Sequence, residues 1–309
     1  HLGPQGVSHV DLRHYDRLVD MLCANAIAVL ALVDYQTLAR QDWHVNTSAY
    51  IADFTAATRQ LATYFQDRIR YWEVWNEPNF ALSGIDPGAY AQLLIATYDT
   101  IKAIEADDKV VFAGLAQATG QVAGNSNDYF GAVSLALGAR QNPAPYDVFA
   151  LHPYPSNEYT VKGKVVVDPS IYLRWEQPTT IHKFFTTMTQ NGKENQPIWI
   201  TEMGWNRAAD STNPITKACP AVNQTMVTGS QQALYAVRSF DILFKETGWS
   251  ATIPAVNKIF WYQYADVAIP AAACAAAIAA GSTPASLVAY RTNNAAPSQA
   301  ADWWFGLYS

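Results

Sequence analysis

Residues 70–76 read Arg-Tyr-Trp-Glu-Val-Trp-Asn, and Glu77-Pro78-Asn79 follow them directly. The aromatic and β-branched residues of this stretch predict a buried β-strand, and the polar pair Asn76-Glu77 stands at its carboxyl end. In an α/β sheet of parallel strands, the carboxyl ends of the strands meet at one edge, where ligands bind. The stretch therefore predicts both a strand of such a sheet and the beginning of a functional site.

Strand-like and helix-like segments alternate on both sides of this stretch. Apolar runs predict further strands at residues 27–33, 109–115, 147–151, 197–201 and 258–262. Apolar stripes of helical period predict helices from residue 11 to about 23 and at 51–65, 87–104, 129–137, 172–189 and 231–244. Such alternation implies right-handed crossovers and a parallel sheet. No Gly-rich phosphate loop follows the first strand, which argues against a dinucleotide-binding fold.

Reactive side chains stand just after three of the predicted strands. Glu77 follows one strand, His152 and Tyr154 follow another, and Glu202 follows a third. In a (β/α)8 barrel these positions form the catalytic face. We therefore predict an α/β protein, a (β/α)8 TIM barrel, with residues 1–309 as a single catalytic domain.

The composition excludes several classes of protein. Half of the 309 residues are hydrophobic and 15% are charged, so the chain can bury a sizeable core and is not generally disordered. A net charge of −6 without a basic run argues against nucleic acid as a partner. No stretch is long and apolar enough to predict a membrane span, and no signal peptide opens the chain. The start at His1 fits a processed or trimmed chain.

The three cysteines are too few for a disulfide framework. Cys23 occupies an apolar helix position and is expected to be a buried free thiol, whereas Cys219 and Cys274 stand in two long loops and could pair. Asn46 and Asn223 begin N-glycosylation sequons. Together these features predict a secreted or extracytoplasmic glycoprotein.

Glu77 and Glu202 form the constellation with the clearest chemistry. Both carboxylates are flanked by apolar strand residues and by Trp, which favours burial over the solvated surface position that a lone Glu usually has. Glycoside hydrolysis needs two such groups, one to protonate the leaving oxygen and one to attack the anomeric carbon or activate water. The histidines are scattered without a metal-binding spacing, and no nucleophile elbow is present, so we expect neither a metal site nor Ser-His-Asp catalysis.

The chain resembles clan A glycoside hydrolases. Trp75-Asn76-Glu77-Pro78-Asn79 is similar to the Asn-Glu-Pro signature of that clan, and residues 200–205, Ile-Thr-Glu-Met-Gly-Trp, resemble its nucleophile strand. Residues 149–154 resemble its sixth strand and residues 260–262 its eighth. The order and spacing agree from about residue 11 to residue 262, most closely with family 39-like and cellulase-like members.

This resemblance implies a retaining mechanism with Glu77 as general acid/base and Glu202 as nucleophile, and no cofactor. Their carboxyl groups would then lie about 5–5.5 Å apart. Asn76 would bind the substrate 2-hydroxyl, Trp261 would form a platform for the sugar, and His152 or Tyr154 would lie near Glu202 and tune its ionisation. From their places after predicted strands, Trp205 and Tyr35 are expected to line the substrate cleft.

The pattern departs from the family at the N-terminus. Six strands are predicted, whereas a complete barrel has eight. Matched to the family, residues 27–33 correspond to its third strand, so its first two strands and its second-strand Arg have no counterpart. We expect either a longer parent chain or another segment that supplies the missing strands. Unless another segment supplies them, the protein should be a monomer.

These observations predict an endo-acting hydrolase of β-linked polysaccharides or oligosaccharides, because the aromatic residues are spread over several loops. A transglycosylase would share the same covalent intermediate. A carbohydrate-binding protein with impaired catalysis is favoured by the missing strands and disfavoured by the presence of both carboxylates.

Overall fold

The computed structural model describes residues 12–38, 42–80, 83–116, 126–141, 143–154, 160–161, 164–165, 168–173, 186–193, 195–205, 227–245 and 256–262. The chain forms two compact units. Unit 1 comprises His1–His152, Lys183–Thr201 and Gly248–Lys258, and unit 2 comprises Pro153–His182, Glu202–Thr247 and Ile259–Ser309. The expectation that residues 1–309 form one domain stays a prediction.

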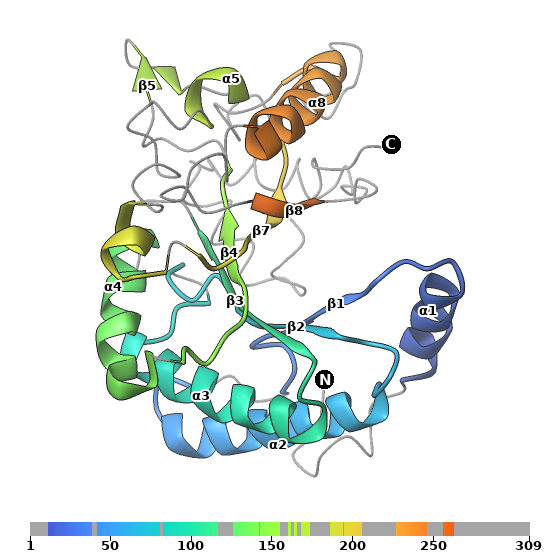
Figure 1. Ribbon diagram of the computed structural model, residues 1–309, viewed down its shortest axis with the longest axis vertical. Coiled ribbons are helices and arrows are strands. Elements are labelled where there is room, and N and C mark those ends of the chain that lie inside the picture. Colours follow the sequence, from blue (N-terminus) through green and yellow to red (C-terminus); the bar gives the residue numbers. More distant parts are fainter. Residues whose placement is uncertain are drawn as a thin grey trace, which may run out of the picture. The chain divides into compact units, whose positions relative to one another are not determined.

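A six-stranded sheet dominates unit 1, with its strands in the order β1-β2-β3-β4-β7-β8 (Figure 1). Neighbouring strands from β1 to β7 pair in parallel, with Leu30 opposite Tyr71 and Tyr71 opposite Lys109 at the start of the sheet. The strands are β1 (Leu30–Val33), β2 (Tyr71–Asn76), β3 (Lys109–Ala116), β4 (Phe149–His152), β7 (Ile198–Met203) and β8 (Val256–Trp261), the last two ending in unit 2. The predicted parallel sheet of a partial (β/α)8 barrel is thereby confirmed.

Helices alternate with these strands as the apolar periodicity predicts. Unit 1 contains α1 (Arg13–Ala24), α2 (Thr47–Tyr64), α3 (Pro87–Ile104), α4 (Ser126–Leu137) and the short 3-10 helix η2 (Gly138–Gln141). Unit 2 contains α5 (Pro169–Tyr172), α8 (Gly229–Lys245) and an antiparallel pair, β5 (Thr160–Val161) and β6 (Lys164–Val165). Within the segment 172–189 predicted as a helix, Tyr172 is the last residue of α5 and residues 186–189 are helical, and residues 174–185 lie outside the described part of the chain.

The helix α3 shows how local sequence and packing agree. Pro87 occupies its first turn, where no backbone N–H is needed, and the Asp86 carboxylate accepts hydrogen bonds from two N–H groups of that turn. The Tyr90 hydroxyl, fully buried, donates to the Val74 carbonyl at 3.1 Å and accepts from the Ala113 N–H at 2.9 Å. The helix is therefore tied to both β2 and β3, the strands that position the site described below.

The first strand is shorter and more exposed than the sequence predicts. β1 begins at Leu30 rather than Ile27, and the side chains of Ile27 and Leu32 are 51% and 44% exposed. The reason is its place in the sheet, because among the described residues β1 pairs with β2 alone. An apolar run that suits a strand covered on both sides thus forms an edge strand.

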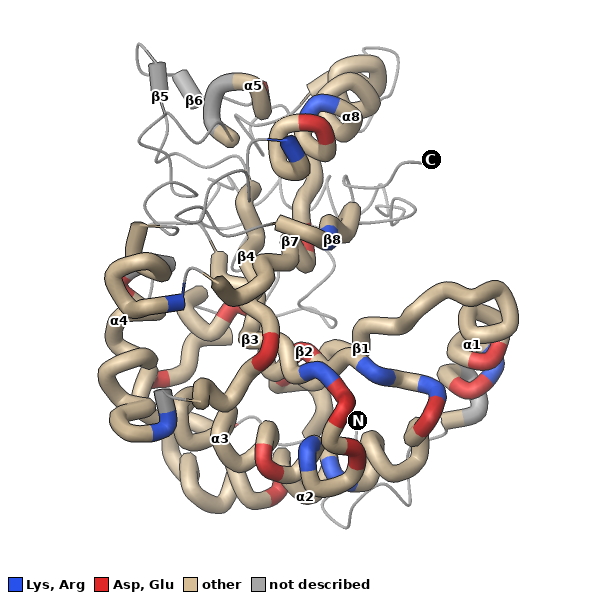
Figure 2. The backbone as a smooth tube through the Cα atoms, viewed as in Figure 1, with Lys and Arg blue, Asp and Glu red and all other residues tan. Residues whose placement is uncertain are grey.

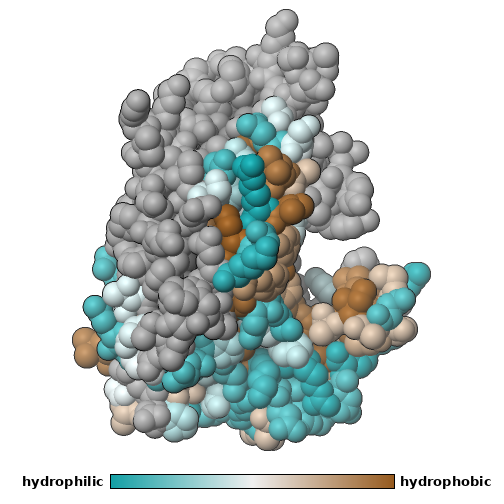
Figure 3. Space-filling model, turned by 45° about the horizontal axis from the view of Figure 1, so that its top comes forward, coloured by the Kyte–Doolittle hydropathy of each residue, from teal (hydrophilic) through white to brown (hydrophobic). Residues whose placement is uncertain are grey.

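The expectation of a buried Cys23 is wrong. Cys23 is exposed on α1, and its thiol lies 3.4 Å from the Arg68 carbonyl. Tyr15 and Met21 of the same helix are also more than half exposed, and Figure 3 shows hydrophobic residues at the surface of this part of unit 1. Val19 of α1 is buried, as is Leu12 just before the helix, and Cys23 lies on the same face of the helix. Cys23 is nevertheless exposed, because the described residues around it do not cover it.

Of the residues predicted to be glycosylated or to form a disulfide, the structure describes only Asn46. Asn46 is exposed just before α2, as a glycosylation site requires. Cys219, Asn223 and Cys274 lie outside the described residues. The disulfide, the glycosylation and the secreted location therefore stay predictions.

The charges of unit 1 are mixed in sign. Figure 2 shows basic and acidic residues close together on unit 1, and Arg68 and Arg70 pair with Asp16 and Asp108 at 2.9 and 3.2 Å. Within the described part of the chain, no helix has the length and apolar character needed to cross a membrane.

Candidate active site

Glu77 lies on a sharp backbone corner directly after β2. Trp75 and Glu77 have φ angles of +77° and +43°, in the left-handed region that residues other than glycine rarely adopt. The Glu77 N–H donates to the Gly114 carbonyl at 3.1 Å, and the Glu77 carbonyl accepts from the Ser83 hydroxyl at 2.7 Å. Strained backbone that neighbouring contacts hold in place is typical of functional sites.

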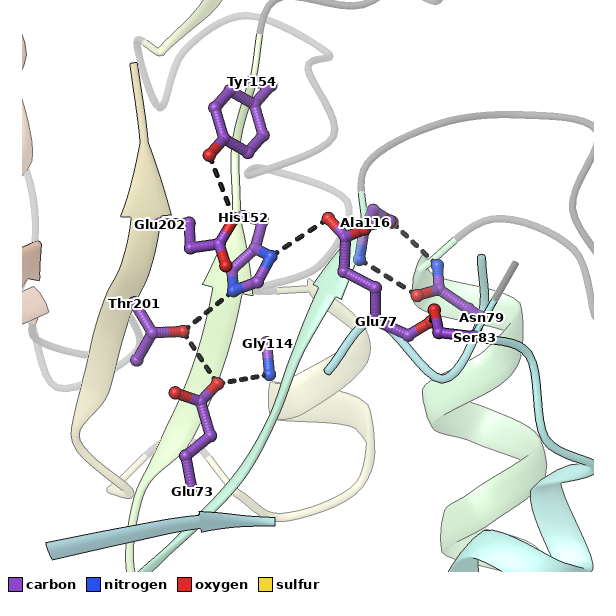
Figure 4. A network of polar contacts seen from close by, with 10 residues as sticks. All are labelled: Glu73, Glu77, Asn79, Ser83, Gly114, Ala116, His152, Tyr154, Thr201 and Glu202. Carbon is purple, nitrogen blue, oxygen red and sulfur yellow. Dashed lines mark hydrogen bonds and ion pairs between the residues drawn. The ribbon is translucent and has the colours of Figure 1, made fainter. Parts of the chain in front are cut away.

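Asn79 joins this corner to the neighbouring strand. Its side-chain amide donates to the Ala116 carbonyl at 2.7 Å, and its side-chain oxygen accepts from the Ala116 N–H at 2.9 Å (Figure 4). Asn79 is fully buried, so the two bonds are shielded from water. The pair extends the ladder between β2 and β3 past the end of β2 and fixes where the Glu77 side chain leaves the backbone.

A chain of polar contacts runs through unit 1 from Glu77 to Glu73 (Figure 4). Glu77 Oε1 lies 3.0 Å from His152 Nδ1, and His152 Nε2 lies 3.0 Å from Thr201 Oγ1. The Thr201 hydroxyl donates to Glu73 Oε1 at 2.9 Å, and the Gly114 N–H donates to the same oxygen at 2.8 Å. Strands β2, β3, β4 and β7 each contribute to this chain, so its geometry depends on the whole sheet.

Burial controls the electrostatics at the Glu73 end of the chain. Glu73 is 4% exposed, and desolvation raises the pKa of its carboxyl group. A charge on His152 and the hydrogen bonds from Gly114 and Thr201 oppose this rise in pKa, whereas the charge of Glu77 adds to it. Burying a carboxyl group this deeply costs free energy unless the group is hydrogen-bonded. A buried carboxyl group held by several hydrogen bonds therefore indicates a functional site.

Tyr35 and Asn76 lie beside Glu77 in unit 1. Burial raises the pKa of the Tyr35 hydroxyl, and the charges of Asp34 and Glu77 add to the rise, while hydrogen bonds from the Gln36 and Asn76 side chains oppose it. Asn76 Oδ1 is buried and has no hydrogen-bond partner among the described residues. Three residues that the sequence predicts for the site, Tyr35, Asn76 and Glu77, are thus brought together.

The aromatic surroundings of Tyr35 are buried. Its ring lies 5.9 Å from that of Trp43 and 5.8 Å from that of Trp75, and both tryptophans are at most 5% exposed. The Trp75 indole N–H donates to the Ser83 carbonyl at 2.8 Å. The rings of Tyr35, Trp43 and Trp75 thus pack together beside the backbone corner at Glu77.

Glu202 and Tyr154 meet in unit 2. The Tyr154 hydroxyl donates to Glu202 Oε2 at 3.0 Å (Figure 4). A donor on a carboxylate oxygen favours the ionised form of the acid. Of the two residues expected near Glu202, the structure thus assigns this hydrogen bond to Tyr154, while His152 bonds Glu77 and Thr201.

Trp205 and Trp261 also meet in unit 2. Their ring centroids are 5.7 Å apart, and Tyr235 of α8 lies 5.6 Å from Trp205. Trp205 is 1% exposed, and its carbonyl accepts from the buried Gln232 side chain at 2.8 Å. The assignment of Trp205 and Trp261 to the sugar-binding surface stays a prediction.

Sequence reasoning gave no role to Glu73, Gly114, Asn79 or Thr201. Two of them carry a local signal, because Glu73 is a charged residue within an apolar strand and Gly114 is a glycine within one. Neither signal says which residues they contact. The expectations that the protein has no metal and no cofactor stay predictions.

No protein-family model matches this sequence, and no curated protein sequence matches it. Solved structures do match. A family 39 glycoside hydrolase from Bacteroides cellulosilyticus WH2 has a TM-score of 0.52 at 18% identity, over 84% of this chain and 49% of that one. A GH2 β-galacturonidase from Eisenbergiella tayi has a TM-score of 0.51 at 12% identity, over 85% of this chain and 37% of that one. Xylanase 10B from Thermotoga maritima has a TM-score of 0.50 at 13% identity, over 84% of this chain and 69% of that one.

The chain thus spans about half or less of the length of the first two proteins. The three neighbours bear the names of a family 39 glycoside hydrolase, a GH2 β-galacturonidase and a xylanase, in agreement with the resemblance seen in the sequence. At identities of 12–18% the likeness establishes the fold. The strands and helices of this chain therefore form part of a (β/α)8 barrel.

Proposed function

We propose that this protein is a retaining glycoside hydrolase that cleaves β-linked polysaccharides or oligosaccharides, with Glu77 as general acid/base and Glu202 as nucleophile. The observation that carries the proposal is the strained, fully braced corner that presents Glu77 at the end of a barrel strand. The fold shared with glycoside hydrolases of families 39, 2 and 10 supports it.

The chemistry requires opposite protonation states of the two carboxyl groups. In the first step the Glu202 carboxylate attacks the anomeric carbon, while the proton of Glu77 passes to the leaving glycosidic oxygen. In the second step Glu77 takes a proton from water, which attacks the anomeric carbon and releases Glu202 as a carboxylate. The Tyr154 hydroxyl supports the ionised state of Glu202 by donating to its Oε2.

Asn76 is suited to hold the sugar. Its side-chain oxygen is buried and lacks a partner among the described residues, and Asn76 is the last residue of β2. A buried acceptor without a donor is costly, and a substrate hydroxyl would supply the donor. Binding of the 2-hydroxyl by Asn76, a contact that strengthens in the transition state, accounts for this arrangement.

We further propose endo action on an extended glycan, with Trp261 and Tyr35 on the substrate surface and the buried Trp205 packed beside Trp261. A transglycosylase would use the same carboxylates and differ in whether a sugar hydroxyl or water resolves the intermediate. The two are separated by following the products in water and with an added acceptor sugar.

The test is an assay of new reducing ends on β-glucans, xylans, mannans and galactans, with Glu77→Gln and Glu202→Gln beside the wild type. Glu105→Gln is the matched control, because Glu105 pairs with Arg70 at the carboxyl end of α3. We expect hydrolysis by the wild type and the control, and a loss of at least about 10³-fold in both active-site variants. Equal rates in all four proteins would contradict the assignment of the carboxylates.

The stereochemistry tests the mechanism separately. ¹H NMR of the first product should show retention of the anomeric configuration. A 2-deoxy-2-fluoro glycoside with a good leaving group should label Glu202, which peptide mass spectrometry would locate. Inversion, or a label on another residue, would overturn the double displacement.

A further inference from the structure

The hydrogen bonds around Thr201 have a definite direction. Glu73 Oε1 accepts from the Gly114 N–H and from the Thr201 hydroxyl. A hydroxyl has a single proton, and that of Thr201 is directed to Glu73. Towards His152, Thr201 can therefore act only as an acceptor.

This direction fixes which imidazole nitrogen carries the proton. His152 Nε2 lies 3.0 Å from Thr201 Oγ1, so Nε2 must be the donor of that bond. In a neutral imidazole only one nitrogen is protonated, which leaves Nδ1 with a lone pair. Nδ1 lies 3.0 Å from Glu77 Oε1.

We propose that Glu73 and Thr201 are positioning residues that hold His152 in its Nε2–H tautomer, so that neutral His152 offers Glu77 an acceptor and not a donor. The proposal rests on the proposed role of Glu77 as general acid. All of the residues involved belong to unit 1.

The consequence concerns the kind of hydrogen bond that His152 offers to Glu77. A donor on the carboxylate of Glu77 would favour its ionised form, whereas an acceptor favours the protonated carboxyl group that an acid catalyst needs. The opposite tautomer, with a proton on Nδ1, would supply that unwanted donor. Holding the tautomer therefore keeps an acceptor beside the carboxyl group proposed as the general acid.

Burial makes this device effective. His152 is 1% exposed and Glu73 4%, so water cannot replace Thr201 as the partner of Nε2. Among the described residues of unit 1, the charge of Glu73 interacts with those of His152 and Glu77, and the Tyr35 hydroxyl interacts with the charge of Glu77. Glu202 is the next residue after Thr201 along β7 and belongs to unit 2.

The tautomer can be measured without any substrate. ¹⁵N-histidine-labelled protein gives different ¹⁵N shifts for protonated and unprotonated ring nitrogens, and the His152→Gln spectrum identifies the His152 signals among the 6 histidines. We expect Nε2–H in the wild type above the pH at which the ring becomes neutral. A proton on Nδ1 in the wild type would overturn the proposal.

Substitutions at Thr201 test the cause. Thr201→Val keeps the shape but removes the acceptor, so we expect the proton to move to Nδ1 and the alkaline limb of the kcat/KM–pH profile to fall by about 1 pH unit. Thr201→Ser restores the hydroxyl and should keep both properties of the wild type. A Thr201→Val profile that coincides with that of the wild type, at equal thermal stability, would contradict the proposal.

Glu73→Gln separates hydrogen-bond direction from charge. The side-chain oxygen of the introduced glutamine can still accept from Gly114 and Thr201, so the Nε2–H tautomer and the alkaline limb should be kept. A shifted limb with an unchanged tautomer would assign the effect to the Glu73 charge and overturn the mechanism. If the wild type shows the Nε2–H tautomer and yet hydrolyses no glycan, the proposed function fails while the tautomer assignment stands.

Discussion

Gly114 lies directly against the imidazole ring of His152. A Cβ at residue 114 would come 1.9 Å from His152 Nε2 and 2.4 Å from Cδ2, far inside van der Waals contact. The ring thus occupies the space that any other residue at this position of β3 would need. This one absent side chain allows His152 to reach both Thr201 and Glu77.

The first prediction concerns this contact. Gly114→Ala should displace the His152 ring, lower the free energy of unfolding by about 1–3 kcal/mol and reduce kcat at least about tenfold, because the core around the ring is closely packed. Urea unfolding and steady-state kinetics measure the two effects. Gly131→Ala is the control, since a Cβ there meets nothing within 4 Å. It should stabilise α4 by up to about 1 kcal/mol, and equal losses in both variants would refute the steric argument.

The second prediction concerns the corner after β2. Asn79→Ala removes both hydrogen bonds to Ala116 and leaves a buried N–H and a buried carbonyl without partners. The loss in the free energy of unfolding should be about 1–3 kcal/mol, with a fall in kcat because Glu77 is no longer held. Asn25→Ala, at an exposed site after α1, should change stability by less than about 0.5 kcal/mol. Chemical denaturation measures the free energy of unfolding of both variants. An Asn79→Ala protein as stable as Asn25→Ala would show that the two hydrogen bonds from Asn79 to Ala116 contribute little to stability.

The third prediction concerns the hydroxyl on Glu202. Tyr154→Phe removes a donor to the Glu202 carboxylate, so the pKa of that group should rise and the acidic limb of the kcat/KM–pH profile should move to higher pH. Tyr146→Phe is the matched control, because the Tyr146 hydroxyl is buried and lacks a hydrogen-bond partner among the described residues. Its removal should leave the profile unchanged and stability unchanged or higher. An unmoved acidic limb in Tyr154→Phe would remove Tyr154 from the proposed mechanism.

The fourth prediction concerns Asp34, just after β1. Burial raises the pKa of this carboxyl group from 3.8 to about 6, against an opposing hydrogen bond from the Gln36 N–H. Between these two pH values the folded protein binds the proton more tightly than the unfolded chain. The stabilisation is therefore complete below about pH 3.8 and is lost as the pH rises through about 6.

Asp34→Asn should remove this pH dependence. The full shift would correspond to about 3 kcal/mol, which partial exposure of the side chain reduces to roughly 1–2 kcal/mol. Asparagine keeps an acceptor for Gln36, so the variant should be the more stable protein at pH 7 and lose its advantage near pH 4. Urea unfolding at both pH values tests this, and a stability difference that is the same at pH 4 and pH 7 would exclude Asp34 as its source.

Much of the fold follows from the sequence alone. The apolar runs at 70–75 and 109–115 predicted strands whose ends lie within one residue of those observed, because a buried parallel strand is a short apolar run. Pro87 marked the start of α3 because proline suits the first turn of a helix. The predicted burial of Leu32 and Cys23 was wrong, because burial depends on which other segments pack against a residue. Both residues are apolar enough to be buried, but the described residues around them do not cover them.

The same division holds for the site. The sequence by itself determined that Glu77 and Glu202 stand at the ends of barrel strands, because strand ends are local features of the chain. Only the tertiary structure decided that Glu73 is hydrogen-bonded to Thr201, which is 128 residues away, and that His152 joins Thr201 to Glu77. These side-chain hydrogen bonds connect different strands, so they depend on the register of the strands and on the space left by Gly114. The pattern of apolar and polar residues along one strand predicts neither of these.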